Sequence, residues 1–142
     1  MSRLNIALSI IATILIIALV FFWDKLGAPG SDWKASEFAD INAVQSSDLI
    51  KNGWIPEWLP ASAVAIKETH NVDSKAGFLF FHFGEQDLET LRNVCARILQ
   101  PLPELPKDLS ADWKPGKPDE FYSCQGAMMA VDSKQLSALL WR

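Results

Sequence analysis

The chain has few of the residues on which most catalytic and metal sites depend. It contains two cysteines, two histidines and seven glycines among 142 residues. The glycines never occur in a run, which excludes a glycine-rich phosphate-binding loop. The motifs Gly-x-Ser-x-Gly and Cys-x-x-Cys are also absent from the sequence. We therefore predict no catalytic residue, no bound cofactor and no metal site, and we favour a protein without enzymatic activity.

Clusters of positive charge are missing as well. Residues 27–142 hold 11 basic and 16 acidic residues, which gives this part a net charge of −5, and the basic residues are scattered singly. Nucleic acids and anionic surfaces are usually bound by clustered lysine and arginine. The charge pattern therefore excludes nucleic acid from the expected partners.

One long apolar run is present, and it begins at Leu4 and ends at Trp23 without a charged residue. A helix of about 20 apolar residues spans the roughly 30 Å hydrocarbon core of a bilayer. The alternative is a cleavable secretory signal, whose cleavage site requires two small residues separated by one position. Here the only such site has Pro29 at its centre. We predict that residues 1–26 form a transmembrane anchor in contact with the lipid bilayer.

The charges beside the run predict its orientation. Arg3 precedes it, whereas Asp24 and Lys25 cancel each other after it. The positive-inside rule then places a short N-terminus in the cytoplasm and everything after the run outside it. We predict a single-pass membrane protein, with residues 27–35 as a linker and residues 36–142 as an exported domain. About 110 residues are enough for one hydrophobic core.

Cys95 and Cys124 are the whole thiol content of the chain, and both lie in the part predicted to be exported. In an oxidising compartment an even pair of cysteines favours a structural disulfide over a metal site, which needs further close ligands. The bridge would close a segment that contains five prolines (Pro101, Pro103, Pro106, Pro115 and Pro118). In a reducing compartment the two would instead be buried as small apolar residues.

Hydrophobic periodicity predicts the elements of this domain. Residues 36–52 fit one or two short helical turns, and residues 53–60 (GWIPEWLP) are too rich in proline to be a regular element. Residues 63–69 and 77–83 are predicted to form an antiparallel hairpin, with a turn that contains His70. Residues 121–131 and 137–141 are predicted to form a second strand pair.

Between the two strand pairs the apolar period changes to that of a helix. Leu88, Leu91, Cys95 and Ile98 recur at steps of three and four, which predicts a helix over residues 86–100 with one buried stripe. The predicted fold class is α+β: an N-terminal transmembrane helix is followed by a small antiparallel sheet of about four strands, with one main helix on one face.

Residues 53–74 (GWIPEWLPASAVAIKETHNVDS) resemble a stretch found in a family of uncharacterised bacterial envelope proteins. Members of that family are membrane-anchored or lipoprotein-like, and they share a Gly-Trp-x-Pro-x-x-Leu-Pro-x-Ser-Ala block that leads into a strand. The resemblance implies a bacterial origin and an exported domain, and it implies no activity. Together with the predicted anchor, it implies a protein of the bacterial inner membrane whose domain lies in the periplasm. This chain departs from the lipoprotein-like members because it has no lipobox cysteine.

Five residues are candidates for contact with a partner: Trp54, Trp58, Trp113, His70 and Asp73. The three tryptophans lie in proline-rich loops, where large aromatic side chains either pack over the edge of a core or form a recognition surface. His70 and Asp73 fall in the predicted turn, and a metal there would need at least one further ligand. Asp73 is more simply a turn residue that bonds its own backbone.

The candidate residues leave two functions open. The first is a membrane-anchored interaction or accessory module, whose partner is an envelope protein, a peptide or a cell-wall glycan. The second is a small envelope hydrolase that uses His70 and acidic residues. Exposed loop tryptophans without converging titratable groups favour the first function, and a cleft that joins His70 with two carboxylates favours the second.

Overall fold

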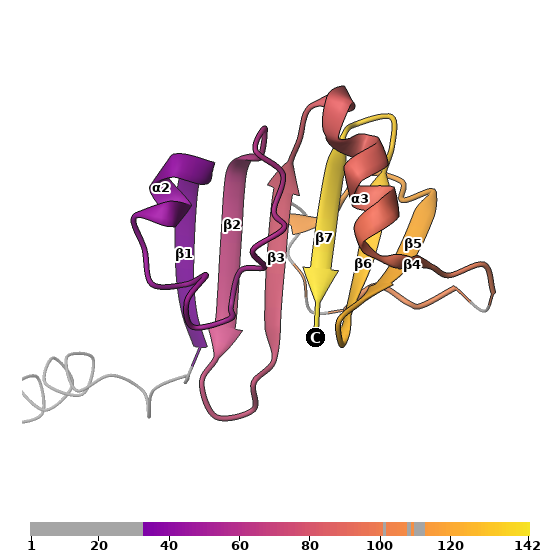
Figure 1. The fold of residues 1–142 in the computed structure, drawn as a ribbon. Helices are drawn as coiled ribbons and strands as arrows, with labels where there is room; N and C mark the ends of the chain where they lie inside the picture. Colours follow the sequence, from indigo (N-terminus) through magenta and orange to yellow (C-terminus); the bar gives the residue numbers. More distant parts are fainter. Residues whose placement is uncertain (1–32, 101, 108, 110–112) are drawn as a thin grey trace, which may run out of the picture. The chain divides into compact units, whose positions relative to one another are not determined.

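A single sheet of seven antiparallel strands is the main feature of the computed structural model (Figure 1). The structure describes residues 33–100, 102–107, 109 and 113–142. The order in the sheet is β1-β2-β3-β7-β6-β5-β4, so the last strand of the chain pairs with β3 in the middle and joins two antiparallel halves. The strands are β1 (Trp33–Asp40), β2 (Val64–Asn71), β3 (Gly77–His82), β4 (Ala96–Arg97), β5 (Glu120–Cys124), β6 (Ala127–Asp132) and β7 (Ser137–Trp141).

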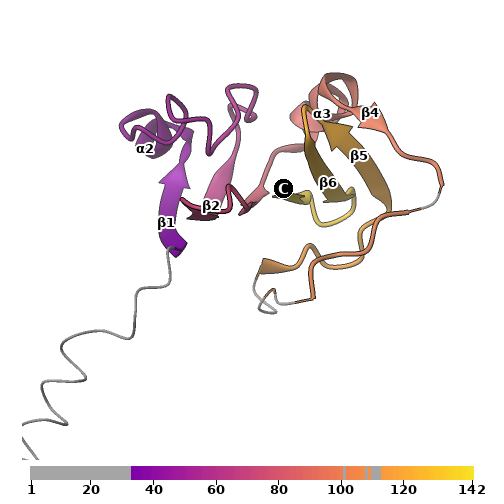
Figure 2. The same cartoon turned by 90° about the horizontal axis from the view of Figure 1, so that it is seen from below.

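The predicted fold class is wrong in both of its main parts. The sheet has seven strands and not four, and the helices of the described residues are short. They are α2 (Ile41–Gln45), the 3₁₀ turn η1 (Glu85–Asp87) and α3 (Leu88–Val94). Between residues 33 and 142, as far as the structure describes them, no main helix covers the sheet. Instead α2, the loop after it and α3 share one face of it (Figure 2).

The helix predicted over residues 86–100 ends early because the backbone becomes extended at Cys95 and enters the sheet at Ala96. Cys95 has φ −122° and ψ 155°, and the next residue, Ala96, pairs with Ser123 of β5. Cys95 and Cys124 form the predicted disulfide, with their Cα atoms 4.7 Å apart. The predicted helical stripe is therefore correct for Leu88 and Leu91. Beyond Val94 the chain forms the disulfide and the β4–β5 pairing in place of further helical turns.

The strand predicted over residues 121–131 is in fact a hairpin. Gln125 and Gly126 both have positive φ, 48° and 89°, and Cys124 pairs directly with Ala127 across them. Two successive residues in this conformation match the twist of antiparallel strands, so a two-residue turn can close the hairpin. The Gln-Gly pair was the local signal for this turn, and the apolar residues on either side concealed it.

The start of the domain also differs from its prediction. Residues 36–40 belong to the edge strand β1, and only α2 is helical in the segment that follows. Asp40 separates the two elements, because its side chain accepts a hydrogen bond from the backbone N–H of Ala43 and caps α2. β1 begins at Trp33, within the segment 27–35 that the sequence predicts as linker.

Both faces of the central strands are buried. Phe81 is fully buried in the larger core, which lies under α2, α3 and the loop between α2 and β2. Phe80 points to the other face, where it packs with Leu139 and with Leu109 from the segment before β5. Figure 2 shows that segment on the side of the sheet opposite to the helices. Burial on two faces explains the continuous apolar runs of β3, β6 and β7.

The predicted hairpin of residues 63–69 and 77–83 is confirmed as the antiparallel pair β2–β3. In the part of the chain that the structure describes, no helix has the length and apolar character needed to cross a bilayer. The predicted anchor, residues 1–26, lies outside those residues.

Candidate functional site

The loop between α2 and β2 contains the block GWIPEWLP, and backbone hydrogen bonds hold its first turn. The N–H groups of Trp54 and Ile55 both donate to the carbonyl of Leu49, at 2.8 and 3.2 Å. Gly53 has a φ of 75°, which lets the chain reverse just before Trp54. Ile55 and Leu59 point into the main core and are buried, so the loop is fixed over the sheet by its apolar side chains.

Trp54 covers a buried polar pair. Its ring stacks on His70, with centroids 4.0 Å apart, and the guanidinium of Arg142 lies 5.0 Å from the centre of the Trp54 ring. The ammonium of Lys75 lies 5.8 Å from the same ring. His70 lies in β2 and not in the turn, and it is only 5% exposed. The tryptophan therefore separates His70 from the solvent.

Glu68 is the partner of His70 on the same face of β2. The two side chains are 2.7 Å apart, between His70 Nδ1 and Glu68 Oε1, while Glu68 Oε2 has no hydrogen-bond partner. Burial raises the pKa of the Glu68 carboxyl above its ordinary value of 4.5, although the hydrogen bond from His70 and the charge of Arg142 act in the opposite direction. Lys34 of β1 lies opposite His70 in the register.

This arrangement does not assemble a hydrolytic centre. His70 has one carboxylate beside it, and the indole of Trp54 covers the pair. Asp73 is exposed in the following turn, where its N–H and that of Ser74 donate to the side chain of Asn71. Among the described residues no three His, Cys, Asp or Glu side chains are placed to hold a metal ion. The described residues do not place two carboxylates in a cleft with His70, which is the arrangement that the hydrolase hypothesis names.

A cavity of about 340 Å³ opens beside the same loop. One wall is the loop itself, with Trp54, Ile55 and Trp58. The other wall comes from the ends of β3 and β7 and from the β5–β6 turn. Trp54 and Trp58 are thus brought together as predicted candidates, whereas Trp113 packs against the core on the other face of the sheet. The sequence prediction missed Trp141 and Arg142, which also line the cavity.

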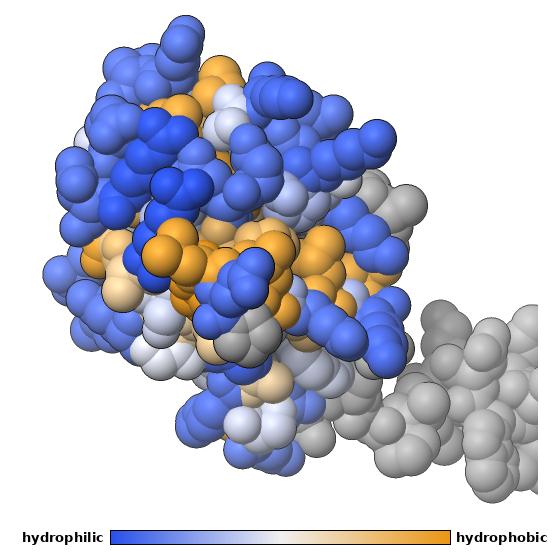
Figure 3. Space-filling view, turned by 90° about the vertical axis from the view of Figure 1, so that its right-hand side faces the viewer, coloured by the Kyte–Doolittle hydropathy of each residue, from blue (hydrophilic) through white to orange (hydrophobic). Residues whose placement is uncertain are grey.

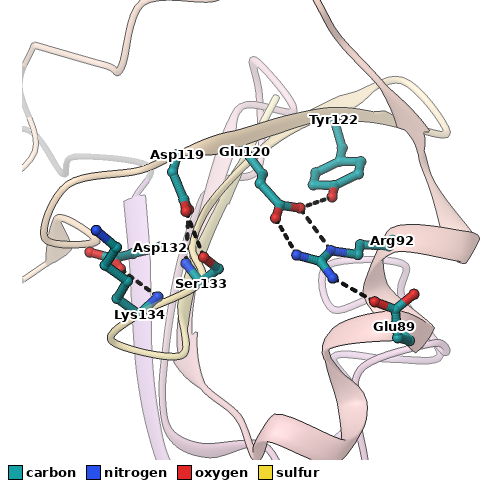
Figure 4. Close-up of polar contacts among 8 residues, drawn as sticks. All are labelled: Glu89, Arg92, Asp119, Glu120, Tyr122, Asp132, Ser133 and Lys134. Carbon is teal, nitrogen blue, oxygen red and sulfur yellow. Dashed lines mark hydrogen bonds and ion pairs between the residues drawn. The ribbon is translucent and has the colours of Figure 1, made fainter.

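A second polar cluster ties α3 to β5 (Figure 4). Arg92 donates two hydrogen bonds to the carboxylate of Glu120, one of them from Nε at 3.0 Å, and a third to Glu89. Tyr122 donates to the same Glu120 carboxylate. The hydrogen bonds from Arg92 are the main reason why the pKa of Glu120 lies below its ordinary value. Burial, followed by the bond to Glu120, raises the pKa of Tyr122 to about 12.

The cluster predicts a pH-dependent loss of stability in the variant Arg92→Gln. Because the folded-state pKa of Glu120 is lowered, its contribution to stability is present above pH 4.5 and is lost as the pH falls through the folded-state value. We expect Arg92→Gln to unfold at lower urea concentration than the wild type at about pH 7, by a margin that shrinks towards about pH 3. Lys114→Gln, which removes an exposed charge outside the cluster, should change little. An equal margin at both pH values would contradict the assignment.

The neighbouring aspartates serve the β6–β7 turn. Asp132 accepts hydrogen bonds from the backbone N–H groups of Lys117, Lys134 and Gln135, at 2.8 to 3.0 Å. Asp119 accepts from the backbone and the hydroxyl of Ser133 (Figure 4). The three backbone hydrogen bonds to Asp132, above all the one from Gln135, hold the pKa of Asp132 below its ordinary value. The two carboxylates are therefore occupied in shaping the turn.

An apolar surface lies at the β4 side of the sheet. Leu99 and Leu102 follow β4 in the chain and are 75% and 57% exposed. Figure 3 shows an apolar patch on this side of the domain, among hydrophilic residues. Neither leucine lines the cavity beside Trp54.

Residues 32–82 match the family model of the YbbD head domain. The match covers β1, α2, the GWIPEWLP loop, β2 and β3, and so supports the bacterial-family part of the resemblance seen in the sequence. It contains one wall of the cavity, while β7 and the β5–β6 turn lie beyond it. No curated protein and no solved structure is significantly similar to the chain.

Proposed function

We propose that this chain is a binding module of the bacterial envelope, and that part of a partner molecule enters the cavity beside Trp54 and Trp58. The observation that supports this most strongly is the cavity itself. Aromatic and aliphatic side chains line it together with charged and polar ones, and about 340 Å³ falls at the lower end of the range for ligand pockets. The one buried histidine nearby is covered and paired, so the site favours binding over chemistry.

The proposed location is the inner membrane, with a cytoplasmic N-terminus and the domain in the periplasm. Two features support it. The apolar run of residues 4–23 is long enough to span a bilayer. The disulfide between Cys95 and Cys124 is of the kind that persists in oxidising compartments. Tethering by the run would keep the cavity close to the membrane surface, within reach of other envelope components.

Site-specific cross-linking in cells tests the proposed binding role. A photoreactive amino acid replaces Lys51, which lines the cavity, and we expect it to form a defined adduct with a partner. Ala127→Leu extends a side chain into the cavity, and it should reduce this adduct at least fivefold, because overfilling a cavity excludes its ligand.

Two controls accompany the cross-linking. The same photoreactive residue at Lys114, which does not line the cavity, should give no such adduct. Ala127→Leu adds three carbon atoms at a residue that lines the cavity, and circular dichroism together with a single cooperative melting transition should show that the variant stays folded. An adduct that survives Ala127→Leu in the folded variant would refute binding in the cavity.

A further inference from the structure

The cavity has a mixed lining, with buried apolar side chains and an exposed, charged mouth. The side chains of Ile55, Leu79 and Leu140 line it and are at most 9% exposed, so a ligand group that enters can contact apolar side chains beside polar surface. Lys51, Glu57, Gln125 and Arg142 also line the cavity and are exposed to solvent. The site therefore suits a ligand with one large apolar group beside polar or charged groups.

Positive charge predominates at this mouth, although the chain as a whole is acidic, with a net charge of −4. Lys51 and Arg142 line the cavity, and Lys75 lies beside Trp54; Glu57 is the single acidic residue in the lining. In the part of the chain that the structure describes, neither Lys51 nor Arg142 forms an ion pair within 4 Å. Their charges remain available to a ligand.

Arg142 is already oriented for this role. Its guanidinium donates one hydrogen bond to the carbonyl of Gly53, at 2.8 Å, and lies over the ring of Trp54. A guanidinium has five N–H donors, so several are left for a carboxylate, which arginine often binds in a bidentate manner. A side chain that is held in place before binding loses less conformational entropy when the ligand arrives.

We infer that the occupant of the cavity is an acidic peptide segment of a partner protein, which inserts one large apolar side chain and places an adjacent carboxylate against Arg142 and Lys51. This inference rests on the proposed function and specifies its partner. The small volume suits one or two side chains, and the exposed Gln125 and Glu57 can bond the backbone of a peptide.

The test uses the full chain in nanodiscs of zwitterionic lipid and a short fluorescein-labelled peptide with a central leucine flanked by aspartates. Fluorescence anisotropy should show binding that weakens with added salt. Replacing the aspartates with asparagine, or the leucine with glycine, should weaken binding about tenfold each, since charge-assisted hydrogen bonds and apolar burial both contribute.

Variants of the chain separate the contributions of the two cations. Arg142→Gln should weaken peptide binding about tenfold, and Arg142→Lys should recover only part of this loss because lysine cannot bind a carboxylate in the same bidentate way. Lys51→Gln should weaken binding without removing a contact that holds the loop, since the Lys51 side chain has no hydrogen bond or ion pair with the other described residues. Lys114→Gln removes the same charge elsewhere and should bind as the wild type does.

The outcomes distinguish this inference from the proposed function. If the asparagine peptide binds as well as the acidic one, or if Arg142→Gln and Lys51→Gln behave like Lys114→Gln, the acidic class is wrong, while loss of binding in Ala127→Leu would still support the cavity. If the two cations instead govern binding to anionic vesicles and the peptide does not compete, the occupant is a lipid headgroup and the inference fails. If Ala127→Leu changes neither peptide binding nor the cellular adduct, the proposed function fails as well.

Discussion

Replacing Cys95 and Cys124 together with alanine should lower the free energy of unfolding by about 3 to 4 kcal/mol. The bridge spans 29 positions of the chain, and closing a loop of that length restricts the unfolded ensemble by about this amount. Both sulfur atoms are also part of the main core, where α3 meets β5. For a domain of this size the melting temperature should fall by on the order of 15 °C.

The measurement is thermal unfolding of the full chain with and without a reducing agent. The wild type should lose stability on reduction, whereas the double variant should not respond, because it has no bridge to reduce. The alkylation of thiols in intact cells provides an independent reading. Cysteines that react only after reduction would agree with an oxidising compartment, and cysteines that react without it would contradict both the bridge and the proposed location.

Truncation of aromatic residues on the two faces of β3 should produce effects of similar size. Phe81 is fully buried in the main core, and Phe81→Ala should cost about 3 to 5 kcal/mol. Phe80 is 5% exposed and belongs to the smaller core on the other face, with Leu139 and Leu109. Phe80→Ala should therefore also cost several kcal/mol, on the order of 3.

Chemical denaturation of the two variants measures these costs separately. Val64→Ala, at a position that is 45% exposed, is the matched control and should change the free energy of unfolding by less than about 0.5 kcal/mol. If Phe80→Ala behaved like Val64→Ala while Phe81→Ala unfolded readily, the sheet would have one buried face only, and the packing of the segment before β5 would be refuted.

The site illustrates why its residues could be foreseen only in part. Trp54 and Trp58 could be predicted as candidates because they lie in a proline-rich loop, and both line the cavity. Glu68 was not predicted, although it lies at every-second-residue spacing between the buried residues Ile66 and His70 on the same face of β2. A period of two that includes a carboxylate is a local sign of a buried charge. Nothing local marked Arg142, which reaches the loop from the other end of the chain.

Local chemistry alone was enough to determine several features of this protein. The β2–β3 hairpin, the irregular GWIPEWLP loop and the pairing of the two cysteines all follow from alternation, proline content and cysteine number. The apolar run of residues 4–23 is likewise a property of composition, and from it we predict an anchor.

The tertiary structure decided what depends on distant partners. Cys95 left its helical stripe because a disulfide and a strand neighbour, both from β5, compete with the last helical turns. β7 took the centre of the sheet because pairing with β3 joins the two halves and buries apolar side chains on both faces. The cavity exists only where the early loop, β3, β7 and the β5–β6 turn meet. Such contacts join residues far apart in the chain. The free energy that favours them therefore cannot be inferred from any short segment of the sequence.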